Sequence, residues 1–148
     1  NTVIIGLQPR GVFLSNRLHA QLPKLTHNKN IEHGELDINF YRDDFRQKEL
    51  IPSKTEIPFI IEDKNVILVD DVLFTGRTIR AGLDALLAFG RPKQVELLVL
   101  IDRRFSRHVP IQPNYVGKTI DSIASQQVKV DWKELDGHDK VTILTIKE

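Results

Sequence analysis

Two adjacent carboxylates, Asp70 and Asp71, follow an apolar run at residues 66–69 and precede a short, hydroxyl-bearing turn at residues 74–78. A buried strand, a tight turn and the first turn of a helix form an anion site, because unpaired backbone N–H groups and the helix dipole point at one place. The carboxylates would repel a bare phosphate but accept hydrogen bonds from vicinal hydroxyls, as an acidic residue does for a ribose. The segment therefore predicts a site for a ribose 5-phosphate.

The flanking residues predict the elements that would hold this site. Residues 66–69 are β-branched or aliphatic, which suits a strand buried on both faces of a parallel sheet, and we expect that strand to end at Asp70. A helix is predicted from the turn to about Phe89, with Gly90 as its stop. Its apolar stripe consists of Ile79, Leu83, Leu86 and Leu87. An isolated pair of aspartates is usually a solvated loop start, but neither a Walker nor a Rossmann glycine pattern competes for this segment.

A second candidate site lies at the start of the chain. Residues 2–7 read as another buried strand, and residues 8–11 form the turn before a helix whose apolar face leaves Arg17 and His19 outside. A turn bearing Arg10 and Gly11 between a strand and a helix predicts a pocket for a polyanion. The competing interpretation of Arg10 is an ordinary residue at a helix N-terminus.

The remaining segments supply two further elements. Residues 35–44 alternate apolar and polar side chains and predict a half-exposed strand, followed by a long charged loop at 43–57 that is either functional or simply solvated. Residues 94–101 predict a second continuous buried strand, followed directly by Asp102. Prolines interrupt the stretch after it, which is expected to be a loop with one short strand near Tyr115 and Val116.

Composition limits the class of protein. A chain of 148 residues with 41% hydrophobic content predicts one α/β domain, residues 1–148. Its net charge of +1 lacks the global positive field of a constitutive nucleic-acid binder. The absence of cysteine excludes disulfides and thiolate metal sites, and the lack of a long apolar stretch makes a cytoplasmic protein the default. Leu83 and Leu87 could lie in a homodimer interface.

Residues 66–78 resemble the phosphoribosyl pyrophosphate (PRPP) signature of type I phosphoribosyltransferases, with four hydrophobic residues, two acids and a small-residue loop. The resemblance implies an α/β fold, with a mainly parallel sheet flanked by helices and a small base-binding hood. It implies that Asp70, Asp71 and Arg10 serve catalysis, and that the two acids meet Mg²⁺ directly or through water. The PRPP-binding residues would be Pro9, Arg10, Gly11, Asp70, Asp71, Val72, Leu73, Phe74, Thr75, Gly76, Arg77 and Thr78.

The same resemblance assigns a base site and a closing loop. Base-binding residues would be Asp102, Arg103, Tyr115, Val116 and Gly117, although a plain edge strand explains the last three equally well. A flexible loop carrying Arg42 and Arg46 would close over the site during turnover and exclude water.

Departures from the purine enzymes of this fold bear on the base. Those enzymes carry a carboxylate where Phe74 stands and a lysine where Asp102 stands. A purine is therefore disfavoured and a smaller pyrimidine is left. Orotate is the rival within the class, because its extra carboxylate would need a fixed cation such as Arg103, Arg104 or Lys118.

The fuller resemblance is to the bifunctional pyrimidine operon attenuator and uracil phosphoribosyltransferase family. It is carried by Pro-Arg-Gly at 9–11, Tyr-Arg-Asp-Asp at 41–44, Gly-Arg-Pro at 90–92, Asp-Arg-Arg at 102–104 and Tyr-Val-Gly-Lys at 115–118. It implies conversion of uracil and PRPP to uridine monophosphate (UMP) and pyrophosphate with Mg²⁺, binding of an mRNA leader, and a homo-oligomer. The alternatives are transfer to another base, orotate or a purine, and a non-catalytic PRPP sensor. Family members place a helix before the first strand, so we expect roughly thirty residues, a helix and its linker, to be missing.

Overall fold

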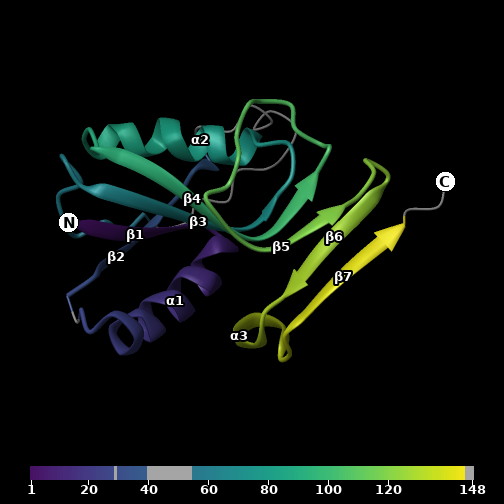
Figure 1. Cartoon of the computed structure of the whole chain (residues 1–148), viewed down its shortest axis with the longest axis horizontal. Helices are drawn as coiled ribbons and strands as arrows, with labels where there is room; N and C mark the ends of the chain where they lie inside the picture. Colours follow the sequence, from purple (N-terminus) through teal and green to yellow (C-terminus); the bar gives the residue numbers. More distant parts are fainter. Residues whose placement is uncertain (29, 40–54, 146–148) are drawn as a thin grey trace.

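The structure is a computed structural model that describes residues 1–28, 30–39 and 55–145. Five parallel strands form its main sheet in the order β2-β1-β3-β4-β5 (Figure 1). These strands are β1 (Thr2–Leu7), β2 (Glu32–Leu36), β3 (Asn65–Leu73), β4 (Gln94–Arg104) and β5 (Tyr115–Asp121). Because parallel strands end at one edge of a sheet, the predicted site segments after β1 and β3 are brought side by side.

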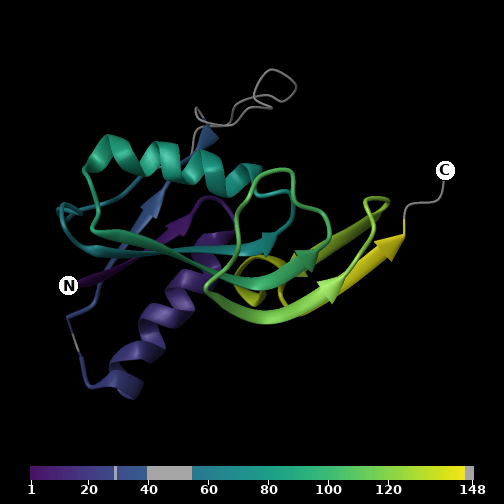
Figure 2. The ribbon, with the colours of Figure 1, turned by 45° about the horizontal axis from the view of Figure 1, so that its top comes forward.

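Two helices cover opposite faces of this sheet, with α1 below it and α2 above it in Figure 2. The elements are α1 (Gly11–Thr26), α2 (Arg77–Leu86) and the short 3₁₀ helix η3 (Leu87–Phe89). The largest hydrophobic cluster joins the sheet to α2 through residues such as Leu68, Val99 and Ile79. None of the helices in the described part of the chain is long and apolar enough to cross a membrane.

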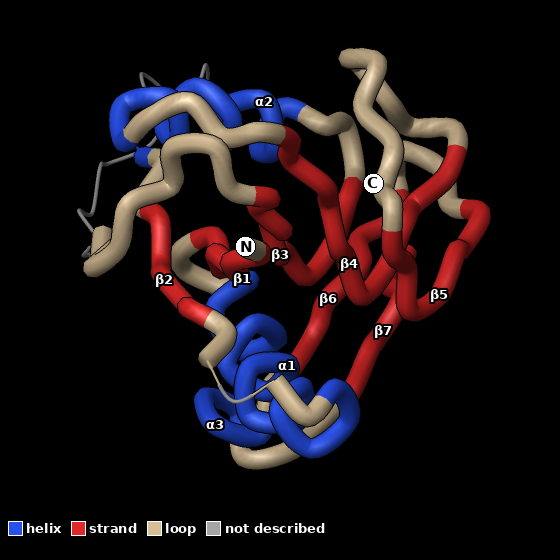
Figure 3. Tube along the Cα trace, turned by 60° about the vertical axis from the view of Figure 1, so that its left-hand side comes forward, coloured by secondary structure: helices blue, strands red, loops and turns tan. Residues whose placement is uncertain are grey.

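A second, two-stranded antiparallel sheet stands beside β5 and forms the lobe seen at the right of Figure 1. It consists of β6 (Gln126–Asp131), α3 (Lys133–Asp136) and β7 (Lys140–Thr145), which we call the C-terminal lobe. A small cluster of Ile101, Val130 and Trp132 joins it to the main sheet. Figure 3 shows that α3 lies next to α1.

Several predicted boundaries were wrong, and strand pairing explains each. The strand expected to end at Asp70 continues to Leu73, because Val72 and Leu73 still pair with Ile101 and Asp102 of β4. For the same reason β4 does not end at residue 101 but runs through Asp102 to Arg104.

The other two corrections concern the outer strands. The strand predicted at 35–44 begins earlier and ends at Leu36, and residues 40–44 lie outside the described residues. The short strand expected near Tyr115 and Val116 is a seven-residue edge strand, β5. Most of its side chains are exposed, so burial does not determine its length. Its backbone pairing with β4 does.

Candidate active site

The paired carboxylates lie near the end of β3, where backbone N–H groups orient both side chains. Asp70 is only 7% exposed, and its Oδ1 accepts a hydrogen bond of 2.8 Å from the Asp71 N–H. Asp71 Oδ1 accepts one of 2.7 Å from the Val72 N–H. Each carboxylate keeps further acceptor capacity after its backbone hydrogen bond. The pair is therefore preorganised to receive hydroxyl donors.

The turn after β3 is braced by the segment at residues 107–109. The Thr75 carbonyl accepts a hydrogen bond of 2.8 Å from the His108 N–H, and the Phe74 carbonyl accepts one of 2.7 Å from Arg107 Nη1. Gly76 caps α2 at φ +90°, and a Cβ there would lie 2.7 Å from Val109 Cγ2. The loop carbonyls are thus occupied, and the Arg77 N–H donates to Thr75 Oγ1 over 3.2 Å. The next N–H groups of α2 lack intrahelical acceptors and can meet a phosphate.

The first loop presses against β3. Gly11 opens α1, and a Cβ at this position would lie 2.3 Å from the Val69 carbonyl oxygen and 2.9 Å from Asp70 Cα. Only glycine allows this approach, which puts the Pro9–Arg10 turn beside the acids. Arg10 Nε lies 3.5 Å from Asp71 Oδ2, and Arg10 Nη2 also donates to the Val130 carbonyl.

A cavity of about 360 Å³ lies between this first loop and the C-terminal lobe. Its lining combines Arg10, Asp71 and Val72 with residues 127–130 of β6. The structure thus brings together Arg10, Gly11, Asp70 and Asp71 as the sequence predicted. Arg42 and Arg46, the predicted closing-loop residues, lie outside the described residues.

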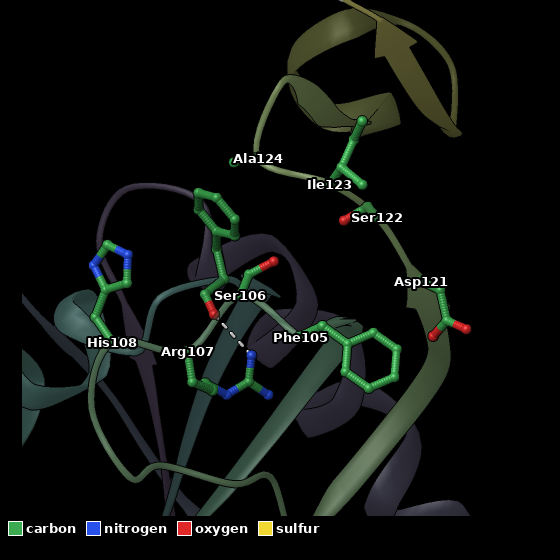
Figure 4. A pocket seen from close by; sticks show the side chains of 9 residues that line it. Phe105, Ser106, Arg107, His108, Asp121, Ser122, Ile123 and Ala124 are labelled. Atoms are coloured by element: carbon green, nitrogen blue, oxygen red, sulfur yellow. Dashed lines mark hydrogen bonds between the residues drawn. The ribbon is translucent and has the colours of Figure 1, made fainter.

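A second cavity, of about 480 Å³, opens beyond the end of β3 and β4 (Figure 4). Its walls are Phe74, Phe105, Ser106, Arg107, His108, Asp121, Ser122, Ile123 and Ala124. Arg107 is held by Asp102, whose side chain is buried, and donates to the Ile111 carbonyl over 2.8 Å. The negative charge of Asp102 is therefore balanced by the guanidinium of Arg107.

Arg103 organises the far wall of this second cavity from a buried position. Its guanidinium lies 3.9 Å from the centroid of the Phe74 ring, and its Nε donates to Ser122 Oγ over 2.8 Å. Its Nη2 donates to the carbonyls of Ile123 and Gln126. Burial lowers the pKa of Arg103 below its ordinary value. Arg103 therefore ties the segment after β5 to the turn after β3.

The other predicted base-binding residues lie elsewhere. Tyr115 and Val116 pair with Leu98 and Val99 at the start of β5, and the Tyr115 hydroxyl donates to Glu96 over 3.2 Å. Together with Gly117, they do not join the lining of the cavity above Asp102.

The residues that line this cavity instead are Ser122, Ile123 and Ala124, which follow the other end of β5. Sequence reasoning missed these three residues. The only signal was a polar, small-residue break after Ile120. The base-binding role of residues 115–117 stays a prediction, and the cavity favours residues 122–124.

The acids fit a magnesium ion as partial ligands. Among the described residues, no group of three or more His, Cys, Asp or Glu side chains could hold a metal by itself. Mg²⁺ prefers oxygen ligands and keeps several waters, so it is usually bound through one or two carboxylates together with substrate phosphates. Asp70 and Asp71 match that pattern.

The comparisons with known proteins agree with this geometry. A family model described as "Phosphoribosyl transferase domain" matches residues 1–134. Solved structures show the same fold: a hypoxanthine phosphoribosyltransferase from Staphylococcus aureus is 22% identical with a TM-score of 0.66, covering 99% of this chain and 76% of that one. One from Trypanosoma cruzi is 18% identical with a TM-score of 0.68, covering 99% and 77%. The fold and the paired acids define a phosphoribosyltransferase domain.

Curated relatives narrow the class further. "Bifunctional protein PyrR" of Bacillus cereus (strain AH820) is 46% identical over 147 residues, which are 97% of this chain and 81% of that protein. The protein of the same name from Bacillus mycoides (strain KBAB4) is 45% identical over the same shares. The chain therefore belongs to the PyrR family of phosphoribosyltransferases.

Proposed function

We propose that the chain transfers ribose 5-phosphate from PRPP to uracil, giving UMP and pyrophosphate. One observation carries this proposal: the Gly11 approach places Arg10 beside Asp70 and Asp71, one turn away from the N-terminus of α2. A ligand at this junction would meet an anion cradle, hydroxyl acceptors and a cation in sequence. PRPP presents a 5-phosphate, ribose hydroxyls and a diphosphate in that order.

Such a transfer needs positioning and charge stabilisation rather than covalent help from side chains. The 5-phosphate would bind the first N–H groups of α2, while Asp70 and Asp71 would accept hydrogen bonds from the ribose hydroxyls and steady a cation-like sugar. Arg10 would neutralise the departing diphosphate. Mg²⁺, when bound through the acids, would spread charge on the diphosphate.

The second cavity supports a pyrimidine as the accepted base. Phe74 offers it an apolar ring without a proton to exchange, and Asp102 is committed to Arg107. Orotate loses support from two of the cations proposed for its carboxylate, Arg103 and Arg104, because both have partners already. Arg103 binds the segment after β5, and Arg104 forms a bidentate pair with Asp121 at 2.7 and 3.0 Å.

The test is a steady-state assay of pyrophosphate release with uracil, orotate and hypoxanthine as separate acceptors. We expect release with Mg²⁺ and uracil, and none above background with the other two bases. Release with orotate or hypoxanthine alone would replace uracil as the substrate. PRPP binding without release for any base would identify a sensor instead of an enzyme.

We further propose that the chain binds an mRNA leader when loaded with UMP, because its relatives are named bifunctional. An exposed basic group at the start of α2 supports this role: Arg77 and Arg80 are exposed, and Arg77 Nε lies 3.3 Å from Nδ1 of exposed His108. Arg107 does not contribute, because its donors are directed inward. A gel shift of the leader transcript, expected only with UMP and weakened by Arg80→Gln, tests this proposal. A homo-oligomer and a cytoplasmic location also stay proposals.

A further inference from the structure

Arg17 of α1 makes a dense set of charged contacts with the C-terminal lobe. Its guanidinium donates to Asp139 through two nitrogens, at 2.7 and 3.0 Å, and to Glu134 Oε1 at 2.6 and 3.0 Å. It also lies 4.9 Å from the centroid of the Trp132 ring. A single exposed ion pair contributes little, but a planar fork on two carboxylates and an aromatic face is a preorganised contact.

The Trp132 ring is held in this contact by packing against its neighbours. The ring is only 4% exposed, and the Phe13 ring also packs beside it, with centroids 6.1 Å apart. The indole Nε1 is buried and has no hydrogen-bond partner. Leaving a buried donor unpaired is unfavourable. The ring therefore lies where its faces, and not its N–H, are satisfied.

Two residues of α1 and the N-cap residue before it meet the lobe on one side of the helix. Arg10, Phe13 and Arg17 are spaced by three and four residues, which places them on a common face. Phe13 and Arg17 both contact Trp132, and Arg17 also holds Glu134 and Asp139. Arg10 donates to the Val130 carbonyl and lies 3.8 Å from Asp136. Asp136 in turn accepts a hydrogen bond of 2.7 Å from the Trp132 N–H. The lobe residues that contact Arg10 and those that contact Arg17 are therefore joined to each other and would move together.

Arg10 has three partners, and the lobe supplies two of them. If the lobe moved away, Arg10 would keep only the Asp71 carboxylate, 3.5 Å from its Nε. Without the lobe, Arg10 would form a closer ion pair with Asp71, and neither side chain would then be available to a ligand. Docking of the lobe therefore keeps Arg10 extended across the cavity of about 360 Å³.

We propose that Arg17 is a positioning residue for the diphosphate end of the donor, acting through the C-terminal lobe on Arg10. This inference rests on the proposed function. The 5-phosphate cradle at α2 and the base cavity are held directly by Arg107 and Arg103, and the partners of Arg17 belong to neither of them. The role is therefore specific to one end of the ligand.

The experiment compares wild type, Arg17→Gln, Arg17→Lys and the lobe-side variant Asp139→Asn, with Lys64→Gln as control. Lys64 makes an exposed ion pair with Glu32 at 2.9 Å and lies 5.7 Å from the Phe59 ring, so it matches Arg17 in kind but lies away from the lobe. Titrations measure the Kd of Mg²⁺–pyrophosphate and the Kd of UMP, each followed by Trp132 fluorescence and calorimetry. Trp132 is the only tryptophan of the chain.

We expect Arg17→Gln to raise the pyrophosphate Kd about tenfold while the UMP Kd stays within about twofold, with red-shifted Trp132 emission. Arg17→Lys and Asp139→Asn should fall between this variant and wild type, and Lys64→Gln should match wild type. Equal weakening of both ligands, or no weakening of pyrophosphate, overturns the role of Arg17. If wild type binds neither ligand, the proposed function fails instead. Should Arg17→Gln not fold, Asp139→Asn decides on the same criteria.

Discussion

Replacement of Gly11 by alanine probes the contact that assembles the site. The added Cβ would lie 2.3 Å from the Val69 carbonyl oxygen, whereas ordinary contact begins at 3.4 Å, so it falls short by about 1 Å. The obstacle is backbone, and the first loop must move by about that distance. Displacements of this size in an active site lower rates by about 10²-fold, and overpacking destabilises by about 1–3 kcal/mol.

The assay is kcat/KM for PRPP, together with denaturant unfolding. Gly82→Ala is the matched control, because its Cβ would meet side-chain methyls instead of backbone, those of Leu7 at 3.2 and 3.3 Å and of Ile38 at 3.9 Å. Alanine also favours a helix interior. We expect Gly11→Ala to lose about 100-fold in kcat/KM and Gly82→Ala to stay near wild type. Wild-type kcat/KM in Gly11→Ala would refute the role given to this close approach.

Three other predictions follow from the same contacts. Arg103→Gln should destabilise the fold by about 2–4 kcal/mol and raise the KM for uracil more than that for PRPP, because it removes buried hydrogen bonds that hold the cavity wall. Arg104→Gln, on the exposed Asp121 pair, should leave unfolding unchanged, and equal effects of the two would contradict the assignment. Burial, and then the nearby His19, lower the pKa of His33. The unfolded chain therefore takes up this proton more readily than the folded protein, so His33 does not affect stability above pH 6.5 and lowers it as pH falls below that value. His33→Gln should flatten unfolding free energy between pH 7.5 and 5.5, and an unchanged slope would argue against it. Arg17 lowers the pKa of Asp139 from 3.8 to about 2, so stability present above pH 3.8 is lost as pH falls toward 2. Asp139→Asn should remove that part of the acid transition, measured by circular dichroism.

The sequence was sufficient where one segment determines its own structure. Continuous apolar runs predicted β1, β3 and β4, and the stripe ending at Leu87 predicted one helix to about Phe89, where the structure has α2 followed by η3. The meeting of Arg10 with Asp70 and Asp71 followed too, because β1 and β3 are parallel neighbours whose ends share an edge.

Features set by distant partners could not be read in the same way. The length of β5 depends on pairing with β4, so the cavity wall came at residues 122–124 and not at Tyr115. Arg17 looked like a surface residue off the apolar face of its helix. Its partners Glu134 and Asp139 are 117 and 122 residues away in the sequence, and no local pattern predicts such a contact.

The most direct test of the site is calorimetric titration of PRPP with Mg²⁺ into wild type and into Asp70→Asn/Asp71→Asn. Both asparagines keep the shape of the aspartates and their ability to accept the backbone hydrogen bonds of 2.8 and 2.7 Å, while the charges disappear. We predict saturable binding by wild type and at least about tenfold weaker binding by the double variant. Equal affinity of the two proteins, or no binding by wild type, would contradict a PRPP site at the end of β3.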